Sequence, residues 1–304
     1  MNPTPLKTWL LAIRPKTLWA AVAPVLIGTA MAYRDGLGHW PSALVALFGA
    51  IMIQIGTNLA NDYFDYKKGA DQSDRLGPLR VTQAKLVKPS AIRTAFIFAF
   101  FLSALACAWL IERAGWPIAI IGILAILSGI FYTAGPRPLG YVGLGEIFVF
   151  IFFGPVAVAG TYYVQSFEIN PAVVLAGLGP GFFSTAILCV NNLRDTEGDR
   201  KAGKKTLAVR FGLEFARCEY LFSILCACLT PILLYVVTQD YENSLIAVPV
   251  VFAAIPVVHS VFTKTDGPSL NGALARTGGL LFLYSILFSL GWMCENNWIR
   301  YLRF

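Results

Sequence analysis

The sequence predicts an all-α protein whose helices cross a membrane several times and pack into one bundle. Of its 304 residues, 57% are hydrophobic and only 13% are charged, and the mean hydropathy is +0.64. An ordinary globular domain has about 25% charged residues. The sequence also contains nine stretches of about 18 residues without Asp, Glu, Lys or Arg. At about 1.5 Å per residue, such a stretch is long enough for a hydrocarbon core of about 30 Å.

Each uncharged stretch is expected to be a helix. In lipid every backbone amide needs a partner within the protein, and the stretches lack the alternating pattern of membrane-barrel strands. In chain order the predicted helices cover residues 17–33, 42–60, 94–111, 117–134, 147–164, 171–190, 220–237, 243–263 and 277–294. The first has no small-residue cleavage site after a short apolar core, so we interpret it as a helix and not as a removable signal peptide.

The basic residues predict which end of the bundle faces the cytoplasm. With a cytoplasmic amino terminus, 20 of the 24 Lys and Arg residues fall on that side, including seven in residues 62–93 and seven in residues 194–217. The outer side keeps Arg34, Arg113, Arg300 and Arg303. The positive-inside rule therefore places the long loops in the cytoplasm and the carboxyl terminus outside. Because the net charge of +7 mostly reflects this bias, no nucleic-acid partner is expected.

Two of the predicted helices end in the same polar pattern. The second ends in NDYFD at residues 61–65 and the sixth in NNLRDTEGD at residues 191–199, so N-x-x-x-D occurs twice, 130 residues and four helices apart. Duplication of a four-helix unit would explain the recurrence. We expect a single domain over residues 1–304, with pseudo-repeats at about 10–134 and 144–264, one further helix, and a pseudo-twofold axis along the membrane normal.

The spacing within the second motif predicts a cation site. Asn191, Asp195 and Asp199 share one face if the helix continues, because each step of four residues turns by only about 40°. Carboxylates beside an apolar bundle lose hydration and need a cation. Hard oxygen ligands suit Mg²⁺, which binds through one or two carboxylates together with substrate phosphate. In the first motif, the position that matches Asp199 is occupied by Gly69, and Asp71, two residues further on, is the expected replacement. The candidate ligands for two such ions are Asn61, Asp62, Asp65, Asp71, Asn191, Asp195 and Asp199.

Two other interpretations compete with a catalytic cation site. A loop with charges of both signs is usually a solvated membrane face, but the repeated motif at equivalent helix ends favours a ligand site. Intramembrane acids also mark ion pathways in transporters, whose sites lie near the bilayer midplane in broken helices. Here the acids lie at the cytoplasmic ends and the helix centres are uncharged. This placement favours an enzyme over a transporter.

The two motifs and three further stretches resemble those of a known family. An NDxxD-like motif after the second helix and a DxxxD motif after the sixth are the signature of the UbiA-type intramembrane prenyltransferases, and they match residues 61–65 and 195–199. Within that family the chain looks most like the menaquinone branch, the dihydroxynaphthoate prenyltransferases. The stretches that carry this likeness are RPKTL at 14–18, RLGPLRVTQ at 75–83 and YTAGPRPLGYVGLGE at 132–146. The resemblance covers nearly the whole chain.

The resemblance implies a reaction, and the charged and aromatic residues near the motifs are the candidates to carry it. It implies Mg²⁺-dependent transfer of a polyprenyl group from its diphosphate to 1,4-dihydroxy-2-naphthoate, with loss of CO₂ and diphosphate, in menaquinone or phylloquinone biosynthesis at a bacterial inner membrane. Another aromatic acceptor, such as 4-hydroxybenzoate, is the alternative. The expected catalytic residues are Asp65, Asp195, Asp199 and Tyr132. The expected substrate-binding residues are Lys16, Asn61, Asn191, Arg137, Arg194, Lys201 and Lys205.

The chemistry suits these residue types. An allylic diphosphate ionises when its leaving oxygens are neutralised, and metal ions with Lys and Arg act where that charge develops. An aromatic face such as that of Tyr132 stabilises the allylic cation and excludes water, although Tyr is also common at membrane interfaces. Arg137 is suited to the acceptor carboxylate, to a phosphate, or to a lipid headgroup. Glu146 is suited to the positive end of its own helix.

Overall fold

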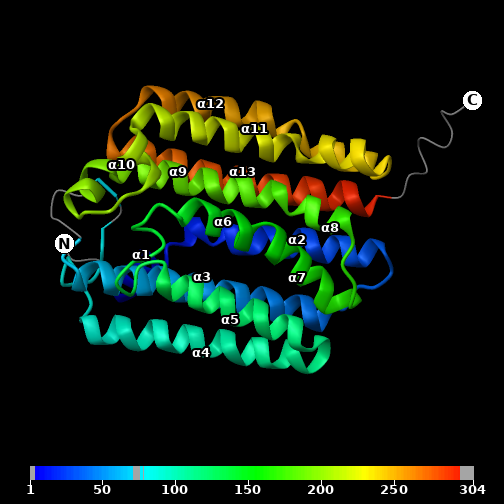
Figure 1. Ribbon diagram of the computed structural model, residues 1–304, viewed down its shortest axis with the longest axis horizontal. Coiled ribbons are helices and arrows are strands. Elements are labelled where there is room, and N and C mark those ends of the chain that lie inside the picture. Colours follow the sequence, from blue (N-terminus) through cyan, green and yellow to red (C-terminus); the bar gives the residue numbers. More distant parts are fainter. Residues whose placement is uncertain (1–3, 71–75, 78, 295–304) are drawn as a thin grey trace, which may run out of the picture.

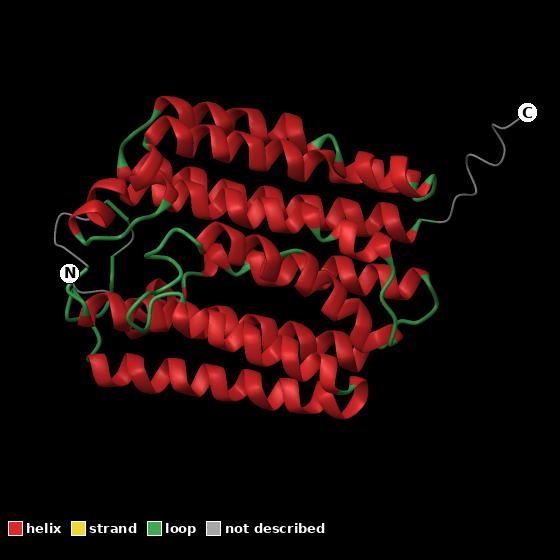
Figure 2. Cartoon of the chain, viewed as in Figure 1, coloured by secondary structure: helices red, strands yellow, loops and turns green. Residues whose placement is uncertain are grey.

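The chain folds into a bundle of helices that run side by side along its long axis (Figure 1, Figure 2). The computed structural model describes residues 4–70, 76–77 and 79–294, and this part of the chain forms helices and loops without a strand. Its elements are α1 (Pro5–Ile13), η1 (Pro15–Thr17), α2 (Trp19–Arg34), α3 (Trp40–Lys67), α4 (Pro89–Ala114), α5 (Trp116–Phe131), α6 (Gly145–Phe153), α7 (Pro155–Ser166), α8 (Pro171–Ala176), α9 (Leu178–Lys201), α10 (Leu207–Phe211), α11 (Leu213–Thr238), η2 (Glu242–Ala247), α12 (Val250–Thr263) and α13 (Gly267–Met293). The predicted all-α class is confirmed.

Every predicted membrane helix is helical in the structure, but the count of nine is approximate. Among the described residues, seven helical runs are long and apolar enough to cross a membrane, and the α1–α2 region, bent by 49°, makes an eighth if it counts as one span. The remaining predicted helix, α5, has 16 residues. At that length it spans about 24 Å, less than a hydrocarbon core of about 30 Å. The protein is therefore a multi-pass integral membrane protein.

Two of the spans are interrupted where they touch each other. α6 passes to α7 at Gly154, and α8 passes to α9 at Gly177. A β-carbon at Gly154 would lie 2.6 Å from the Gly177 carbonyl oxygen, and one at Gly177 would lie 2.5 Å from the Pro155 α-carbon. Only glycine allows two backbones to approach so closely. The paired interruptions therefore fix α9, which carries the second motif, against the α6–α7 span.

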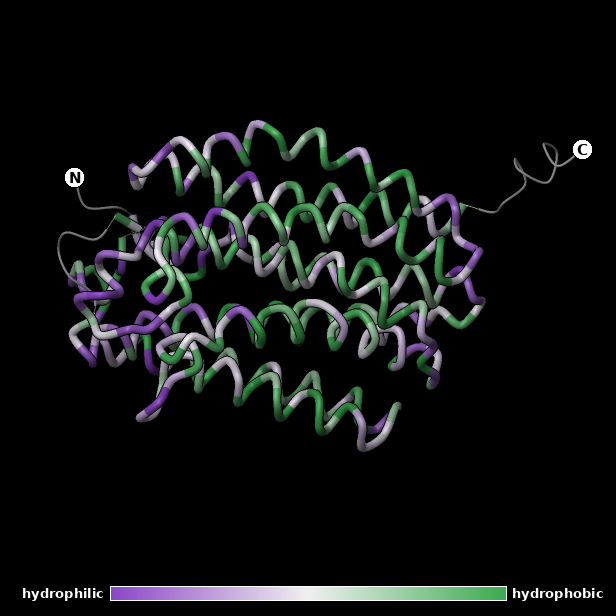
Figure 3. Tube along the Cα trace, turned by 45° about the horizontal axis from the view of Figure 1, so that its top comes forward, coloured by the Kyte–Doolittle hydropathy of each residue, from purple (hydrophilic) through white to green (hydrophobic). Residues whose placement is uncertain are grey.

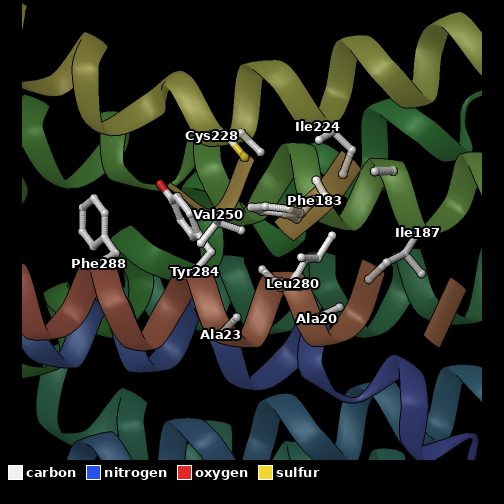
Figure 4. Packing of buried hydrophobic residues seen from close by; sticks show 14 of the residues in the cluster. Ala20, Ala23, Phe183, Ile187, Ile224, Cys228, Val250, Leu280, Tyr284 and Phe288 are labelled. Carbon is white, nitrogen blue, oxygen red and sulfur yellow. The ribbon is translucent and has the colours of Figure 1, made fainter. Parts of the chain in front are cut away.

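The core around α9 is built from large apolar side chains. Phe183 and Ile187 of α9 lie in one cluster with Ile224 and Cys228 of α11 and Tyr284 of α13 (Figure 4). α9 packs most extensively against α11 and also against α13, whereas α3 packs most extensively against α4. The two helices that carry the motifs thus belong to different parts of the bundle. Each is held by its own neighbours, so its polar end has a defined position.

The hydrophilic residues gather at the two ends of the bundle, with apolar residues between them (Figure 3). α3, α5 and α9 all end at the side drawn on the left in Figure 1, and their loops converge there. These are the loops that the positive-inside rule assigns to the cytoplasm. Two of the four predicted outer basic residues, Arg300 and Arg303, lie outside the described residues.

Candidate active site

A polar cavity of about 60 Å³ lies where α3, α9 and the loop at residues 132–144 meet. Both motifs contribute to its wall. Asn61 and Asp65 come from α3, and Asn191, Asp195 and Asp199 come from α9. α9 continues to Lys201, so the three residues of the second motif do share one helical face. The structure therefore brings together the two N-x-x-x-D patterns that lie far apart in the sequence.

Asp65 is the most heavily bonded acid of the first motif. It is buried and accepts hydrogen bonds from Arg80 Nη2 at 3.0 Å and from the Tyr141 hydroxyl at 2.7 Å. Lys204 Nζ lies 3.5 Å from the same carboxylate oxygen that Arg80 contacts. Because an unpaired buried carboxylate is costly, these partners compensate Asp65 and fix its orientation toward the cavity.

Asp195 is held by the residue before it in the chain. The Arg194 guanidinium donates to both Asp195 oxygens, at 2.8 and 2.7 Å, and Arg194 is itself buried. The same guanidinium donates to Asn191 Oδ1 and to Asn271 Oδ1 of α13, each at 2.7 Å. Arg194, expected to bind substrate, therefore lies beside the cavity and orients two of its wall residues, Asp195 and Asn191.

Asp199 shares a lysine with the first motif. Lys204 Nζ lies 3.3 Å from Asp199 Oδ1 as well as close to Asp65, and 4.8 Å from the centre of the Tyr141 ring. The ammonium thus connects the acidic ends of α3 and α9. Asp65, Asp195 and Asp199 each have a cationic partner, so much of their negative charge is compensated within the protein.

Tyr132 lies at the junction of two cavities. It lines the polar cavity and also a second, apolar cavity of about 200 Å³. Residues of α2 to α7 form the wall of this second cavity, and most of them are Ala, Gly, Ile and Val. The arrangement offers a polar site for a charged head group beside an apolar space for a hydrocarbon chain, with Tyr132 in the wall of both.

The loop that follows Tyr132 is tied to both motifs. The Thr133 hydroxyl donates to Asn61 Oδ1, and Lys68 Nζ donates to the Thr133 carbonyl oxygen at 2.7 Å. Glu146, at the start of α6, is buried and accepts a hydrogen bond from Asn192 Nδ2 at 2.7 Å. Glu146 therefore contacts a wall residue of the polar cavity, in addition to lying in the first turn of its helix.

Several predicted residues lie away from the cavity. Asp62 is buried beside Val81 and Thr82 in the segment after α3. Asp62 and Asp65 thus face consecutive residues of this segment, since Arg80 pairs with Asp65. The side chains of four predicted substrate-binding residues are exposed, namely Lys16, Arg137, Lys201 and Lys205. Asp71 lies outside the described residues.

Some wall residues were not selected from the sequence. Arg14 and Arg80 appeared only within the stretches that carry the family resemblance. Tyr141 was one of several tyrosines at predicted cytoplasmic helix ends, and Lys204 was one of several bases suited to balance the negative charge. Asn192, Thr133 and Thr206 line the cavity without any prior signal. Asn192 directly follows the motif residue Asn191, but adjacent helical residues face in directions about 100° apart, so the spacing did not predict that both would line the cavity.

The donor set of the polar cavity fits a hard divalent cation. Its wall offers carboxylate and amide oxygens, which are the ligands that Mg²⁺ prefers. Within the described part of the chain, no three His, Cys, Asp or Glu side chains lie close enough to enclose a metal ion by themselves. Mg²⁺ usually keeps several waters and completes its shell with substrate phosphate, so an open set of this kind suits it.

Comparisons with known proteins identify the family. Residues 21–292 match the model of the UbiA prenyltransferase family. The chain belongs to the UbiA prenyltransferase family. As a member of this family, it is a prenyltransferase enzyme, which agrees with the site geometry and with the resemblance carried by its motifs.

Related proteins of this family match over most of the chain. A 1,4-dihydroxy-2-naphthoate octaprenyltransferase from Haemophilus influenzae is 37% identical, covering 94% of this chain and 96% of that protein. The protein of the same description from Escherichia coli is 41% identical over 73% of this chain and 76% of its own length. Among solved structures, a UbiA homologue from Archaeoglobus fulgidus bound to DMAPP and Mg²⁺ aligns with a TM-score of 0.65 and 15% identity, covering 93% of this chain and 99% of that chain. That similarity shows a shared fold.

Proposed function

We propose that this protein transfers a polyprenyl group from polyprenyl diphosphate to 1,4-dihydroxy-2-naphthoate at a bacterial inner membrane, toward menaquinone or phylloquinone. The observation that carries the proposal is that Tyr132 lines two neighbouring cavities, one polar and lined by both acidic motifs, the other apolar. A prenyl diphosphate has the same division into a charged head and a hydrocarbon chain. The names of the two bacterial relatives supply the naphthoate as the acceptor.

The polar cavity is assigned to the diphosphate. Asn61, Asp65, Asn191, Asp195 and Asp199 are the residues that would hold Mg²⁺, which neutralises the charge that develops on a leaving diphosphate. Arg14 and Lys204 also line this cavity, and their positive charges suit phosphate oxygens. Arg80 and Arg194 pair with Asp65 and Asp195, so their part is to orient these acids.

The apolar cavity is assigned to the prenyl chain, and Tyr132 to its reacting end. Tyr132 faces both the polar head and the hydrocarbon chain, so its ring lies beside the carbon that bears the diphosphate. An aromatic face attracts the allylic cation formed at this carbon. The surrounding apolar wall keeps water, a competing nucleophile, away from it.

The bond changes need no nucleophile from the protein. The carbon–oxygen bond of the prenyl diphosphate breaks, and its electron pair leaves with the diphosphate. The electron-rich ring carbon that carries the carboxylate forms the new carbon–carbon bond. The bond to the carboxylate then breaks, its electron pair restores the aromatic ring, and CO₂ leaves. The residues of the site bind, orient and exclude water.

The acceptor assignment is tested by a side-by-side assay. Membranes that contain the protein are given a prenyl diphosphate, Mg²⁺ and either carboxyl-labelled 1,4-dihydroxy-2-naphthoate or 4-hydroxybenzoate. We expect prenylated product and labelled CO₂ from the naphthoate and little product from the benzoate. Preference for 4-hydroxybenzoate would overturn the acceptor and leave prenyl transfer in place.

A further inference from the structure

The chain turns back on itself immediately after α9 and delivers a lysine to the cavity. Gly203 follows the last turn of α9 and has a φ of +71°. This left-handed backbone conformation favours glycine, which has no β-carbon. The Gly203 amide donates to the Arg200 carbonyl oxygen at 3.1 Å, and the Lys204 amide donates to the Asp199 carbonyl oxygen at 2.9 Å. These two bonds form a Schellman motif, which ends the helix and sets the direction of the next residue. The position of Lys204 is thus determined by the backbone.

The side chain of Lys204 reaches acids of both motifs. Its Nζ lies 3.5 Å from Asp65 Oδ2 of α3 and 3.3 Å from Asp199 Oδ1 of α9, and only 15% of the side chain is exposed. Two carboxylates from opposite parts of the bundle would repel each other in this low-dielectric site without a cation between them. The ammonium therefore occupies the kind of position that a bound cation would take.

Lysine is suited to a contact that must be released. Its ammonium is a compact point charge on a flexible stem, whereas the planar fork of arginine is suited to a fixed pair such as Arg194 with Asp195. Other bases already orient Asp65 and Asp195 one at a time. The Lys204 ammonium can leave its position between the carboxylates without disturbing those pairs.

We propose that Lys204 is the built-in counter-cation of the two acidic motifs, holding them together in the absence of substrate and transferring its contact to the diphosphate when metal and substrate enter. This proposal rests on the proposed function of the site. It makes Lys204 a competitor of Mg²⁺ when diphosphate is absent and a partner of the diphosphate when it is present. The two effects have opposite signs, and a merely structural lysine would not produce both.

The test measures metal and anion binding separately. Purified wild-type protein, Lys204→Met, Lys204→Arg and Arg200→Met are titrated with Mg²⁺ alone and with inorganic diphosphate at saturating Mg²⁺. Arg200 is a matched control, because it lies at the same helix end and pairs with the exposed Glu197. We expect Lys204→Met to bind Mg²⁺ about tenfold more tightly and Mg²⁺–diphosphate about tenfold more weakly than the wild type. Arg200→Met should match the wild type, and Lys204→Arg should keep the weaker Mg²⁺ binding.

Thermal unfolding gives a second measurement that does not depend on turnover. Without metal, Lys204→Met should unfold at a lower temperature than Arg200→Met, and Mg²⁺ should raise its unfolding temperature more than that of the wild type. A Lys204→Met protein that binds Mg²⁺ no more tightly than the wild type, or that stays unfolded at every Mg²⁺ concentration, overturns the proposal. If the wild type itself binds no Mg²⁺–diphosphate, the proposed function fails, which is a different result.

Discussion

Each acid of the polar cavity is paired with a base, and the pairs differ in kind. Arg194 holds Asp195 with two hydrogen bonds and is itself fixed by Asn271, whereas Lys204 makes single contacts with Asp65 and Asp199. The bidentate pair gives orientation, and the single contacts are easily exchanged. At this scale the site is a set of oriented oxygens whose charge is compensated before any ligand arrives.

Replacing Asp195 by Asn tests whether its charge has a catalytic role. The substitution keeps the size of the side chain but removes one unit of negative charge from the cavity wall, together with one of the two hydrogen bonds that Asp195 accepts from Arg194. Loss of a ligand to a catalytic cation costs several kcal/mol of transition-state stabilisation, so turnover should fall on the order of a thousandfold. Turnover is measured against Mg²⁺ concentration.

Glu197 provides the control for this substitution. It lies two positions along the same helix, is exposed, and pairs with Arg200 at 2.9 Å outside the cavity. Exposed ion pairs contribute little to stability, so Glu197→Gln should be nearly silent. Activity close to that of the wild type in Asp195→Asn would rule out a metal–diphosphate mechanism at this residue.

At the scale of the elements, the site depends on where two helices end and on how one of them is interrupted. α3 and α9 carry their motifs in their last turns, so the polar residues reach the end of the bundle while the apolar turns before them lie in the membrane. α9 is also fixed by the contact between Gly154 and Gly177. The helix that carries the second motif is therefore placed by a backbone contact far from the motif.

Gly154→Ala should destabilise the fold. The added methyl group would lie 2.6 Å from the Gly177 carbonyl oxygen, and backbone atoms cannot move aside as a flexible side chain can. Overpacking of this kind costs about 1–3 kcal/mol, so the unfolding temperature in detergent should fall. Gly272→Ala in α13 is the control, because no neighbouring atom lies within 4 Å of the new methyl group. Equal unfolding temperatures for Gly154→Ala and the wild type would contradict this account.

At the scale of the whole molecule, the chain passes back and forth along the bundle axis, so that loops alternate between its two ends (Figure 1). The motif-bearing ends of α3 and α9 lie at the same end. We propose that this equivalence reflects duplication of a four-helix unit, with repeats at about residues 10–134 and 144–264. The cavity then lies between the repeats, and each repeat contributes one motif.

The orientation in the membrane is a further prediction. Since most of the bases lie at the motif end, that end should face the cytoplasm and the carboxyl terminus should face outward. Fusions of a topology reporter after residue 68 and after residue 304 should report the cytoplasmic side and the outer side, respectively. A cytoplasmic signal from the fusion at residue 304 would contradict a count of nine spans.

The sequence by itself determined the fold class, the approximate helix count and the two motifs that converge on the site. These follow from local properties: uncharged length decides which segments enter the membrane, and a spacing of four residues puts side chains on one helical face. The chemistry of an allylic cation added Tyr132, which lies at the end of a predicted helix and lines both cavities.

Only the tertiary structure decided which charges meet. Lys204 lines the cavity whereas Lys201 and Lys205 point outward, because one glycine after α9 reverses the chain. Asp62 faces the segment that carries Arg80, although it stands between two cavity residues, because neighbouring positions on a helix point in different directions. Asn271 reaches Arg194 from α13 across 77 positions of sequence. Such pairings depend on the packing of distant helices, and no local pattern in the sequence encodes them.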